Sequence, residues 1–423
     1  MSAASGRPAL IFIFVTVLLD VIGFGIIMPV MPALIEEVGG GDIGSAAAIF
    51  GWMAVAFSLA QFLFAPLMGS LSDAFGRRPL LLLAIAGLAL DHVVFAVAPT
   101  LLWLFVARVI AGACGASVVI ANAYVADITA PEGRARAFGL LGAAFGVGFI
   151  LGPAMGGLLG AFGTRVPFWV AAGLAALNFL FGLRMVPESL PQSRRRAFDW
   201  RRANPFGVFR VFAAYGNVLP LLGVLALYFF GSTVYPAIWA FWGTARFGWS
   251  EAMIGATLAL YGVCSALVQG GLAGPASRWL GEGRVVLLSL VLGTVMALAY
   301  GMVGSTLGVV ILTLLHAPEE LAFPTMNAIL SRAAPEDAQG ELQGGIAAAS
   351  NLTMMLGTLF FAQVFARSLD PARPETTSGT AFFVAAAIIA LSLVAFFRLR
   401  RRGPLIPDAP GGAPGGATDP TTP

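Results

Sequence analysis

The sequence Gly69-Ser70-Leu71-Ser72-Asp73-Ala74-Phe75-Gly76-Arg77-Arg78-Pro79 decides how the rest of this chain is interpreted. It lies between two long apolar runs and therefore predicts a short charged turn at a membrane face. Glycines at its two ends permit a tight reversal and a close approach of helices. We expect Asp73 to cap a neighbouring helix or face its positive end, and Arg77 and Arg78 to stay in water.

The composition predicts an all-α integral membrane protein. Of 423 residues, 58% are apolar and 11% are charged, whereas soluble proteins carry about 25% charged residues. The apolar runs are about 20 residues long, as a spanning helix requires. All 24 basic residues are arginine, so the chain has no lysine for a phosphate-binding loop or a Schiff base. We therefore expect no enzyme, no ATP-driven pump and no cofactor.

Twelve apolar runs predict twelve spans, six on each side of a polar segment. We expect a first half at 1–186, a cytoplasmic linker at 187–217, a second half at 218–402 and a disordered tail at 403–423. A weak internal repeat, Gly69–Ile85 against Gly274–Leu290, supports two halves. The runs lie at about 9–34, 46–68, 80–99, 101–126, 137–161, 166–186, 218–242, 252–274, 284–304, 306–330, 343–366 and 379–398.

The arginines predict the orientation. Placing both termini in the cytoplasm leaves only Arg165, Arg246, Arg367 and Arg373 outside, which agrees with the excess of basic residues in cytoplasmic loops. The basic and aromatic stretch of the linker is either a plain connection or a segment lying on the anionic inner leaflet. The net charge of +3 does not indicate nucleic-acid binding.

Three ionisable residues fall inside the spans of the first half, namely Asp20, Asp91 and Arg108. A charged side chain at the centre of a span costs about 2.5–3.5 kcal/mol on insertion scales, so it is usually paired or functional. A carboxylate held between burial and a nearby arginine can take up and release a proton. The alternative is a structural ion pair of Arg108 with Asp20 or Asp91.

The tenth run carries His316, Pro318, Glu319 and Glu320 near its midpoint. The histidine lies three and four residues before the glutamates, so all three can share one helix face. Two adjacent carboxylates in apolar surroundings do not both ionise easily, which predicts a proton site. The alternative is a helix break with solvated or backbone-bonded glutamates.

Glycines gather in the fifth run, together with a proline. Small residues on one face let another helix approach closely, and Pro153 bends the span; plain packing is the alternative explanation. The run contains Gly146, Gly148, Gly152, Pro153, Gly156 and Gly157. The isolated Cys114 and Cys264 predict neither a disulfide nor a metal site.

Taken together, these motifs resemble the major facilitator superfamily, and within it the bacterial tetracycline/proton antiporters. The resemblance implies two six-helix halves around a cavity, with Asp20, Asp91 and Arg108 as essential residues and Gln61 as a cavity residue. It also implies that Gly69, Asp73, Gly76, Arg77 and Arg78 form a gating loop, and that the glycine run marks an exporter. The chain departs from these antiporters at Gly293 and Cys264, where they carry an acid and a histidine.

The expected function is export of an amphipathic, drug-like compound in exchange for protons across a bacterial inner membrane. The alternatives are a proton-coupled metabolite importer on the same fold and a transport-inactive receptor. Trp239 and Trp242 either line the cavity or belong to an interfacial belt. We expect a monomer without metal, with proton coupling at Asp20, Asp91, Arg108, Glu319 and Glu320. Candidate substrate contacts are Gln61, Asn122, Tyr228, Tyr235, Tyr261 and His316.

Overall fold

The fold is entirely helical in the part of the chain that the structure, a computed structural model, describes. Twelve helical segments are long and apolar enough to cross a membrane, which confirms the predicted number of spans. The described residues are 3–115, 117–130, 133–198, 219–332, 339–370 and 372–401. The predicted tail at 403–423, and residues 199–217 of the predicted linker, lie outside them.

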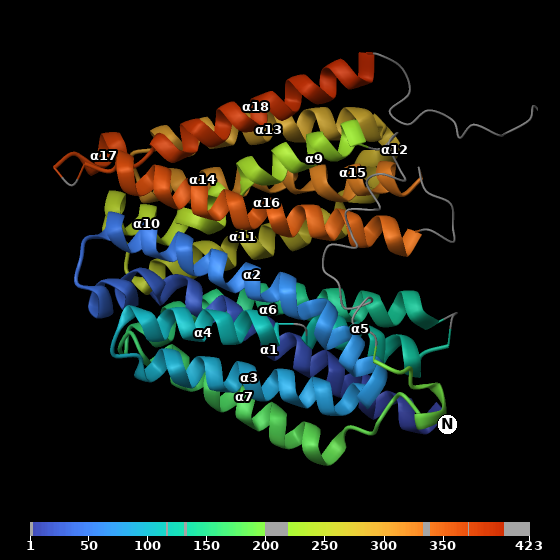
Figure 1. Cartoon of the computed structure of the whole chain (residues 1–423). Coiled ribbons are helices and arrows are strands. Elements are labelled where there is room, and N and C mark those ends of the chain that lie inside the picture. The colour runs from blue at the N-terminus through green and yellow to red at the C-terminus, as the bar shows by residue number, and fades with distance from the viewer. Residues whose placement is uncertain are drawn as a thin grey trace, which may run out of the picture.

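Helices α1 to α7 form one bundle, and the helices from α9 onward form the other (Figure 1). The first bundle contains α1 (Ala3–Gly39), α2 (Ile43–Phe75), α3 (Arg77–Val97), α4 (Leu101–Cys114), α5 (Ser117–Ile128), α6 (Arg134–Gly160) and α7 (Val166–Met185). A short turn, η2 (Gln192–Arg194), follows. The second bundle contains α9 (Leu219–Ser232), α10 (Val234–Phe247), α11 (Glu251–Gly271), α12 (Ala273–Leu280), α13 (Glu282–Met302), α14 (Thr306–His316), η4 (Ala317–Leu321), α15 (Ala322–Ser331), α16 (Gln339–Ser368), α17 (Pro374–Thr377) and α18 (Thr380–Arg401).

The predicted turn at Gly69–Pro79 is wrong in its extent. Helix α2 continues to Phe75, and α3 begins at Arg77, so that only Gly76 separates them. Gly76 has a φ of 109°, a conformation that favours glycine. The Ser72 hydroxyl donates to the Gly69 carbonyl inside α2, so Gly69 is a helical residue and not the start of a reversal.

The tenth span is interrupted at the position of its proline. Helix α14 ends at His316, the 3-10 turn η4 covers Ala317–Leu321, and α15 continues the span. Pro318 has no backbone N–H to donate and cannot continue a regular α-helix. The helix break that we considered is therefore present, and the surroundings of its glutamates are described with the site.

The two bundles share one apolar core and otherwise have cores of their own. The shared core joins Ile27, Met31 and Leu34 of α1 to Phe241 and Trp242 of α10. Two further cores each draw on a single bundle. We call the face where α1 begins and α18 ends the terminal face. The shared core lies toward the opposite face, so the bundles separate toward the terminal face.

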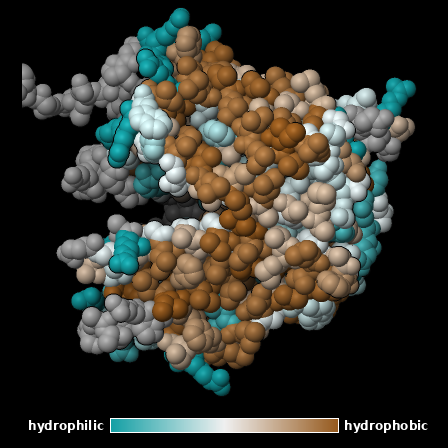
Figure 2. Space-filling model, turned by 180° about the vertical axis from the view of Figure 1, so that it is seen from behind, coloured by the Kyte–Doolittle hydropathy of each residue, from teal (hydrophilic) through white to brown (hydrophobic). Residues whose placement is uncertain are grey.

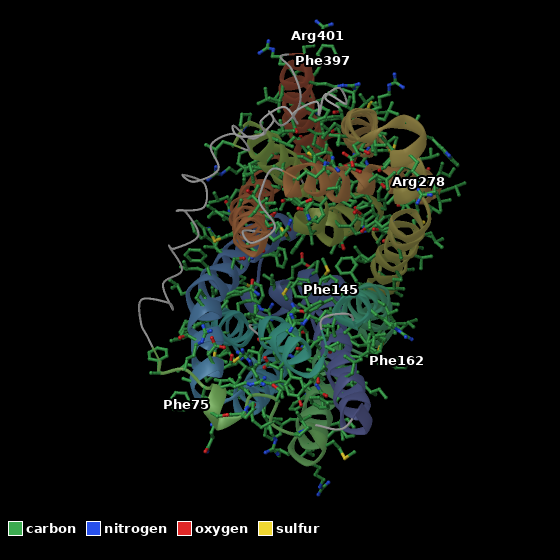
Figure 3. The ribbon with its side chains drawn as sticks, turned by 90° about the vertical axis from the view of Figure 1, so that its right-hand side faces the viewer. Phe75, Phe145, Phe162, Arg278, Phe397 and Arg401 are labelled. Carbon is green, nitrogen blue, oxygen red and sulfur yellow. The ribbon has the colours of Figure 1, made fainter. Side chains whose placement is uncertain are left out.

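The surface agrees with this division. Figure 2 shows apolar side chains over the flank, hydrophilic ones at the two ends, and a hollow between the bundles. Comparison with Figure 1 places the opening of this hollow at the terminal face. The molecule therefore has a cleft that is closed by the shared core at one end and open at the other. Figure 3 looks onto the terminal face and places Phe145 of α6 at the gap between the bundles.

Candidate functional site

In the first bundle, Asp91 and Arg108 form a buried ion pair between α3 and α4. The Arg108 Nη2 atom donates to both carboxylate oxygens of Asp91, at 3.3 and 3.2 Å. The two residues are 1% and 7% exposed, and the guanidinium carbon lies 4.5 Å from the centroid of the Phe95 ring. Of the two partners considered for Arg108, the structure brings it to Asp91. Pairing of this kind is what a buried charge requires.

Asp20 of α1 lies apart from this pair and next to a different residue. It lines a small pocket with Gly23, His92 and Leu88 among others. One Asp20 carboxylate oxygen is buried and has no hydrogen-bond partner. The Nδ1 atom of His92 lies 2.6 Å from the Leu88 carbonyl oxygen, and its Nε2 atom lies 3.4 Å from that of Gly23. Because Asp91 and His92 are consecutive, the pocket and the ion pair adjoin along α3.

In the second bundle, Glu319 of η4 is buried against His316. Their Oε2 and Nε2 atoms are 2.5 Å apart, and the side chains are 2% and 3% exposed. The Ser232 hydroxyl on α9 donates to the other Glu319 oxygen at 3.4 Å. The carboxyl group occupies the space above Gly293, since a Cβ atom there would lie 2.7 Å from the Glu319 Cδ atom. The glutamate of one span thus fills the room that a glycine leaves on another.

Glu320 faces α11. The Tyr261 hydroxyl donates to one of its carboxylate oxygens, and the Gln269 side-chain amide donates to the other at 3.2 Å. Glu320 is half-buried and Gln269 is exposed. The alternative explanation, in which the glutamates are solvated or bonded to backbone, is therefore wrong for Glu319, because the 3-10 turn directs it inward.

Three tyrosine rings surround His316. The ring centroids of Tyr235, Tyr261 and Tyr300 lie 4.7, 5.6 and 5.7 Å from that of the imidazole. The Tyr235 hydroxyl is buried and has no hydrogen-bond partner. The substrate candidates Tyr235, Tyr261 and His316 thus come together around the tenth span.

Of the other substrate candidates, Gln61 and Asn122 lie elsewhere, whereas Tyr228 lies beside Ser232 and Glu319. Gln61 lies where α2 meets the end of α4, since a Cβ atom on Gly115 would be 3.1 Å from its side-chain nitrogen. Asn122 on α5 is exposed, and Tyr228 on α9 belongs to the core of the second bundle. No group of three potential metal ligands occurs among the residues that the structure describes.

Both explanations offered for the two tryptophans of α10 are wrong. Trp242 and Trp239 are 0% and 7% exposed and belong to the core shared by the bundles. The Trp239 indole N–H donates to the Thr257 hydroxyl at 3.0 Å. These rings close the opposite face, because they pack where the two bundles meet.

The glycine run of α6 brings three helices together. A Cβ atom on Gly152 would lie 2.8 Å from the Gly25 Cα atom of α1, and one on Gly148 would lie 2.8 Å from Val21 Cβ. Cβ atoms on Gly156 and Gly157 would collide with the backbones of α1 and α11 respectively. Gly146 faces open space. The run thus packs one helix of the first bundle against the second bundle, as close helix approach through glycine allows.

The loop at Gly76 is held by acidic residues from distant parts of the sequence. Arg77 pairs with Asp73 at 2.5 Å and with Asp127 at 3.2 Å. The Glu188 carboxylate accepts from the backbone N–H groups of Arg77 at 2.8 Å and Arg78 at 3.3 Å, at the start of α3. The Arg77 side chain is only 12% exposed, so the expectation that it stays in water is wrong. Glu188 has the role at the helix start that was expected of Asp73.

Sequence reasoning missed Ser232, Gln269 and Glu188. Each is an ordinary polar residue in its own segment, and each reaches its partner across 51 to 111 positions of sequence. Only the position of Glu188, directly after the sixth apolar run, could have drawn attention to it.

Comparison with known proteins identifies the family. The family model described as Major Facilitator Superfamily matches residues 13–358 and 221–420. The chain belongs to the Major Facilitator Superfamily. Within the superfamily it is 39% identical to the tetracycline resistance protein, class C, of Escherichia coli, over 92% of this chain and 96% of that protein. It is 35% identical to the class G protein of Vibrio anguillarum, over 85% and 91%. The predicted family and fold class are therefore confirmed.

Two solved transporter structures share the fold. A bacterial homolog of the human lysosomal transporter Spinster, in an inward-facing and unoccupied conformation, aligns with a TM-score of 0.76 and 16% identity, covering 95% of this chain and 98% of that one. The human organic anion transporter MFSD10 aligns with a TM-score of 0.67 and 24% identity, covering 94% and 100%. At these identities the likeness concerns the fold alone.

Proposed function

We propose that this chain is a proton-driven exporter of amphipathic, drug-like compounds, of the tetracycline type or another. The observation that carries the proposal is a buried ionisable pair in each bundle, Asp91–Arg108 and His316–Glu319. Ionisable groups inside a membrane span are costly and mark ion or substrate pathways. Relatives named tetracycline resistance proteins and a multidrug resistance protein of Bacillus subtilis, 27% identical, support the substrate class.

The proposed place is the bacterial inner membrane, with both termini in the cytoplasm. The arginines of the loops and of the linker gather on one side of the predicted spans. In this orientation the terminal face is cytoplasmic, and the cleft opens to the interior of the cell. An exporter captures its substrate in this state and releases it after the bundles rock about the bound molecule.

We propose that protons are coupled to transport when a buried carboxylate changes between its charged and its neutral form. Neutralising Asp91 weakens its ion pair with Arg108, whose guanidinium stays protonated. Neutralising Glu319 alters its interaction with His316, which can itself take up a proton. Each change alters the contacts inside one bundle, which is how a proton can favour one orientation of the cleft over the other. Asp20, with its unpartnered oxygen, is a third proposed coupling residue.

A proton-coupled importer is the competing function on the same fold. The glycine run from Gly146 to Gly157 favours an exporter, since it packs α6 against both α1 and α11. A transport-inactive receptor would not need buried ionisable pairs in both bundles. We also propose that the chain acts as a monomer on a small-molecule substrate, without a catalytic reaction.

The direction of proton movement tests the proposal. Inside-out vesicles carrying the full chain are energised, and the internal pH is followed with a dye while candidate compounds are added. An exporter releases protons from the vesicle lumen when its substrate is added, whereas an importer does not. Asp91→Asn should abolish the signal, and Asp42→Asn should preserve it. Asp42 is a matched control because it caps α2 at the surface, and asparagine caps equally well.

A further inference from the structure

The adjacent residues Glu319 and Glu320 lie in different surroundings. Glu319 points inward to His316 and Gly293, and Glu320 points to Tyr261 and Gln269 on α11. We propose that they divide the work of this bundle: Glu319 with His316 carries the proton, and Glu320 binds the positive charge of a planar aromatic cation. The inference rests on the proposed proton-driven export and assigns a substrate class to it.

Glu319 is suited to a proton and to little else. The Glu319 side chain is 2% exposed, and its carboxyl group lies directly over Gly293. There is therefore no room beside it for a larger ligand. His316 is within ion-pair distance, although the atoms are not aligned as a hydrogen bond. With one proton shared between them, the two side chains have no net charge, as burial favours. Losing that proton leaves one negative charge in an apolar interior.

Glu320 has a carboxylate whose charge is not balanced. Its partners, Tyr261 and Gln269, are neutral donors. No basic side chain lies within ion-pair distance of it in the part of the chain that the structure describes. A half-buried carboxylate without a counter-ion attracts a cation more strongly than a fully hydrated one does. Tyr261 and Gln269 carry no charge, so neither becomes an unpaired charge when it turns from Glu320 to a ligand.

The surroundings favour an aromatic cation over a small one. The ring of Tyr261, next to Glu320, is 5.6 Å from the ring of His316, and the ring of Tyr235 is 4.7 Å from that of His316. Aromatic faces attract organic cations and stack on planar rings. Gln269 is exposed near the terminal end of α11, which is the side on which the cleft opens. A ligand entering the cleft therefore reaches Glu320 before it meets Glu319.

The arrangement also accounts for exchange. A cation at Glu320 lies one residue away from the proton site, and like charges repel across a short distance in a medium of low dielectric constant. Binding of the cation therefore favours loss of the shared proton, and uptake of a proton favours release of the cation. Reciprocal coupling of this kind is what antiport requires.

Two compounds of equal shape test the cation site. N-methylacridinium carries a permanent charge, and acridine is uncharged at mildly alkaline pH. Binding of both to the purified full chain is measured by their fluorescence, and proton release is measured with an indicator dye in weak buffer. Glu320→Gln should lower the affinity for N-methylacridinium at least about tenfold, or ~1.4 kcal/mol, and should leave that for acridine unchanged. Glu320→Asp, which restores the charge, should recover part of the loss.

Glu319→Gln should show the opposite pattern. It should keep the preference for the charged compound and lose the proton release that accompanies binding. An equal loss for both compounds in Glu320→Gln, or a wild type that binds neither or does not prefer the cation, would overturn the cation site. Full proton release by Glu319→Gln would overturn the division of work. Proton-driven export of an uncharged compound by the wild type would leave the proposed function standing while the cation site fails.

Discussion

The two bundles each bury an ionisable pair, but the pairs differ in what they can do with a proton. Asp91 faces Arg108, whose guanidinium does not deprotonate in proteins. Glu319 faces His316, and each of these side chains has a neutral and a charged form. The first pair therefore changes charge only at the carboxylate. In the second pair the proton can lie on either partner, so this pair can change its charge in more ways than the first.

A second comparison concerns the loops at the terminal face. In the first bundle, Arg77 at the start of the third span pairs with Asp127 at the end of the fourth. In the second bundle, Glu282 at the start of the ninth span pairs with Arg332 after the tenth. The acidic and basic partners have changed places between the two bundles, but an ion pair joins the equivalent positions in both. The structure therefore shows the repeat more clearly than the sequence does. The pairs differ in burial, because Arg77 is 12% exposed and Arg332 is 58% exposed.

The largest effect is expected from a substitution of Asp91, the carboxylate of the first pair. Asp91→Asn removes the only titrating member of the first pair and should reduce proton-driven efflux by roughly a hundredfold or more. It also leaves Arg108 buried without its counter-ion, which costs about 3–5 kcal/mol of stability. Efflux is measured under an imposed pH gradient, with the amount of inserted protein checked by immunoblot. Undiminished efflux would show that the first bundle has no coupling role.

A smaller effect is expected from Gly293→Ala, which disturbs the second pair without removing a charge. The added methyl group would lie 2.7 Å from the Glu319 carboxyl carbon, and overpacking of this kind costs about 1–3 kcal/mol. Efflux should fall and its pH profile should shift, because Glu319 must move relative to His316. Gly223→Ala on α9 is the matched control, since nothing lies within 4 Å of its added methyl group. An unchanged pH profile would separate Glu319 from the proton step.

Asp73→Asn should have a moderate effect, on rate more than on binding. Arg77 keeps Asp127 when Asp73 is neutralised, and a partly exposed pair contributes about 0.2–1 kcal/mol. We expect transport to slow by a few-fold at most while the substrate dissociation constant stays the same, since the loop lies outside the cleft. Transport rate and equilibrium binding are measured on the same preparation. A large loss of affinity would contradict a gating role.

The smallest effect is expected at the equivalent loop of the second bundle. Glu282→Gln removes the partner of Arg332, which is largely exposed, so the change in stability should stay below about 1 kcal/mol. Thermal unfolding of the purified protein measures it, with transport followed in parallel. If Glu282→Gln slowed transport as much as Asp73→Asn, burial would not be what distinguishes the two loops.

For several site residues, the sequence predicts that an ionisable residue lies inside a span but does not predict its partner. Asp91, Arg108, Glu319 and His316 were recognised because an ionisable residue inside an apolar run is conspicuous in any sequence. Which carboxylate Arg108 would choose could not be decided, since Asp20 and Asp91 both lie at membrane depth. The choice depends on how α1, α3 and α4 pack, and packing places Asp20 in the pocket with His92.

The sequence by itself determined the twelve spans, the family and the positions of the costly residues. Apolar length, glycine spacing and charge at membrane depth are properties of short segments, so they can be read without knowing what each helix touches. Only the tertiary structure decided that α2 continues to Phe75, that Trp242 closes the opposite face, and that Glu319 lies over Gly293. These features depend on contacts between residues far apart in the chain, where shape and the pairing of buried polar groups decide the outcome.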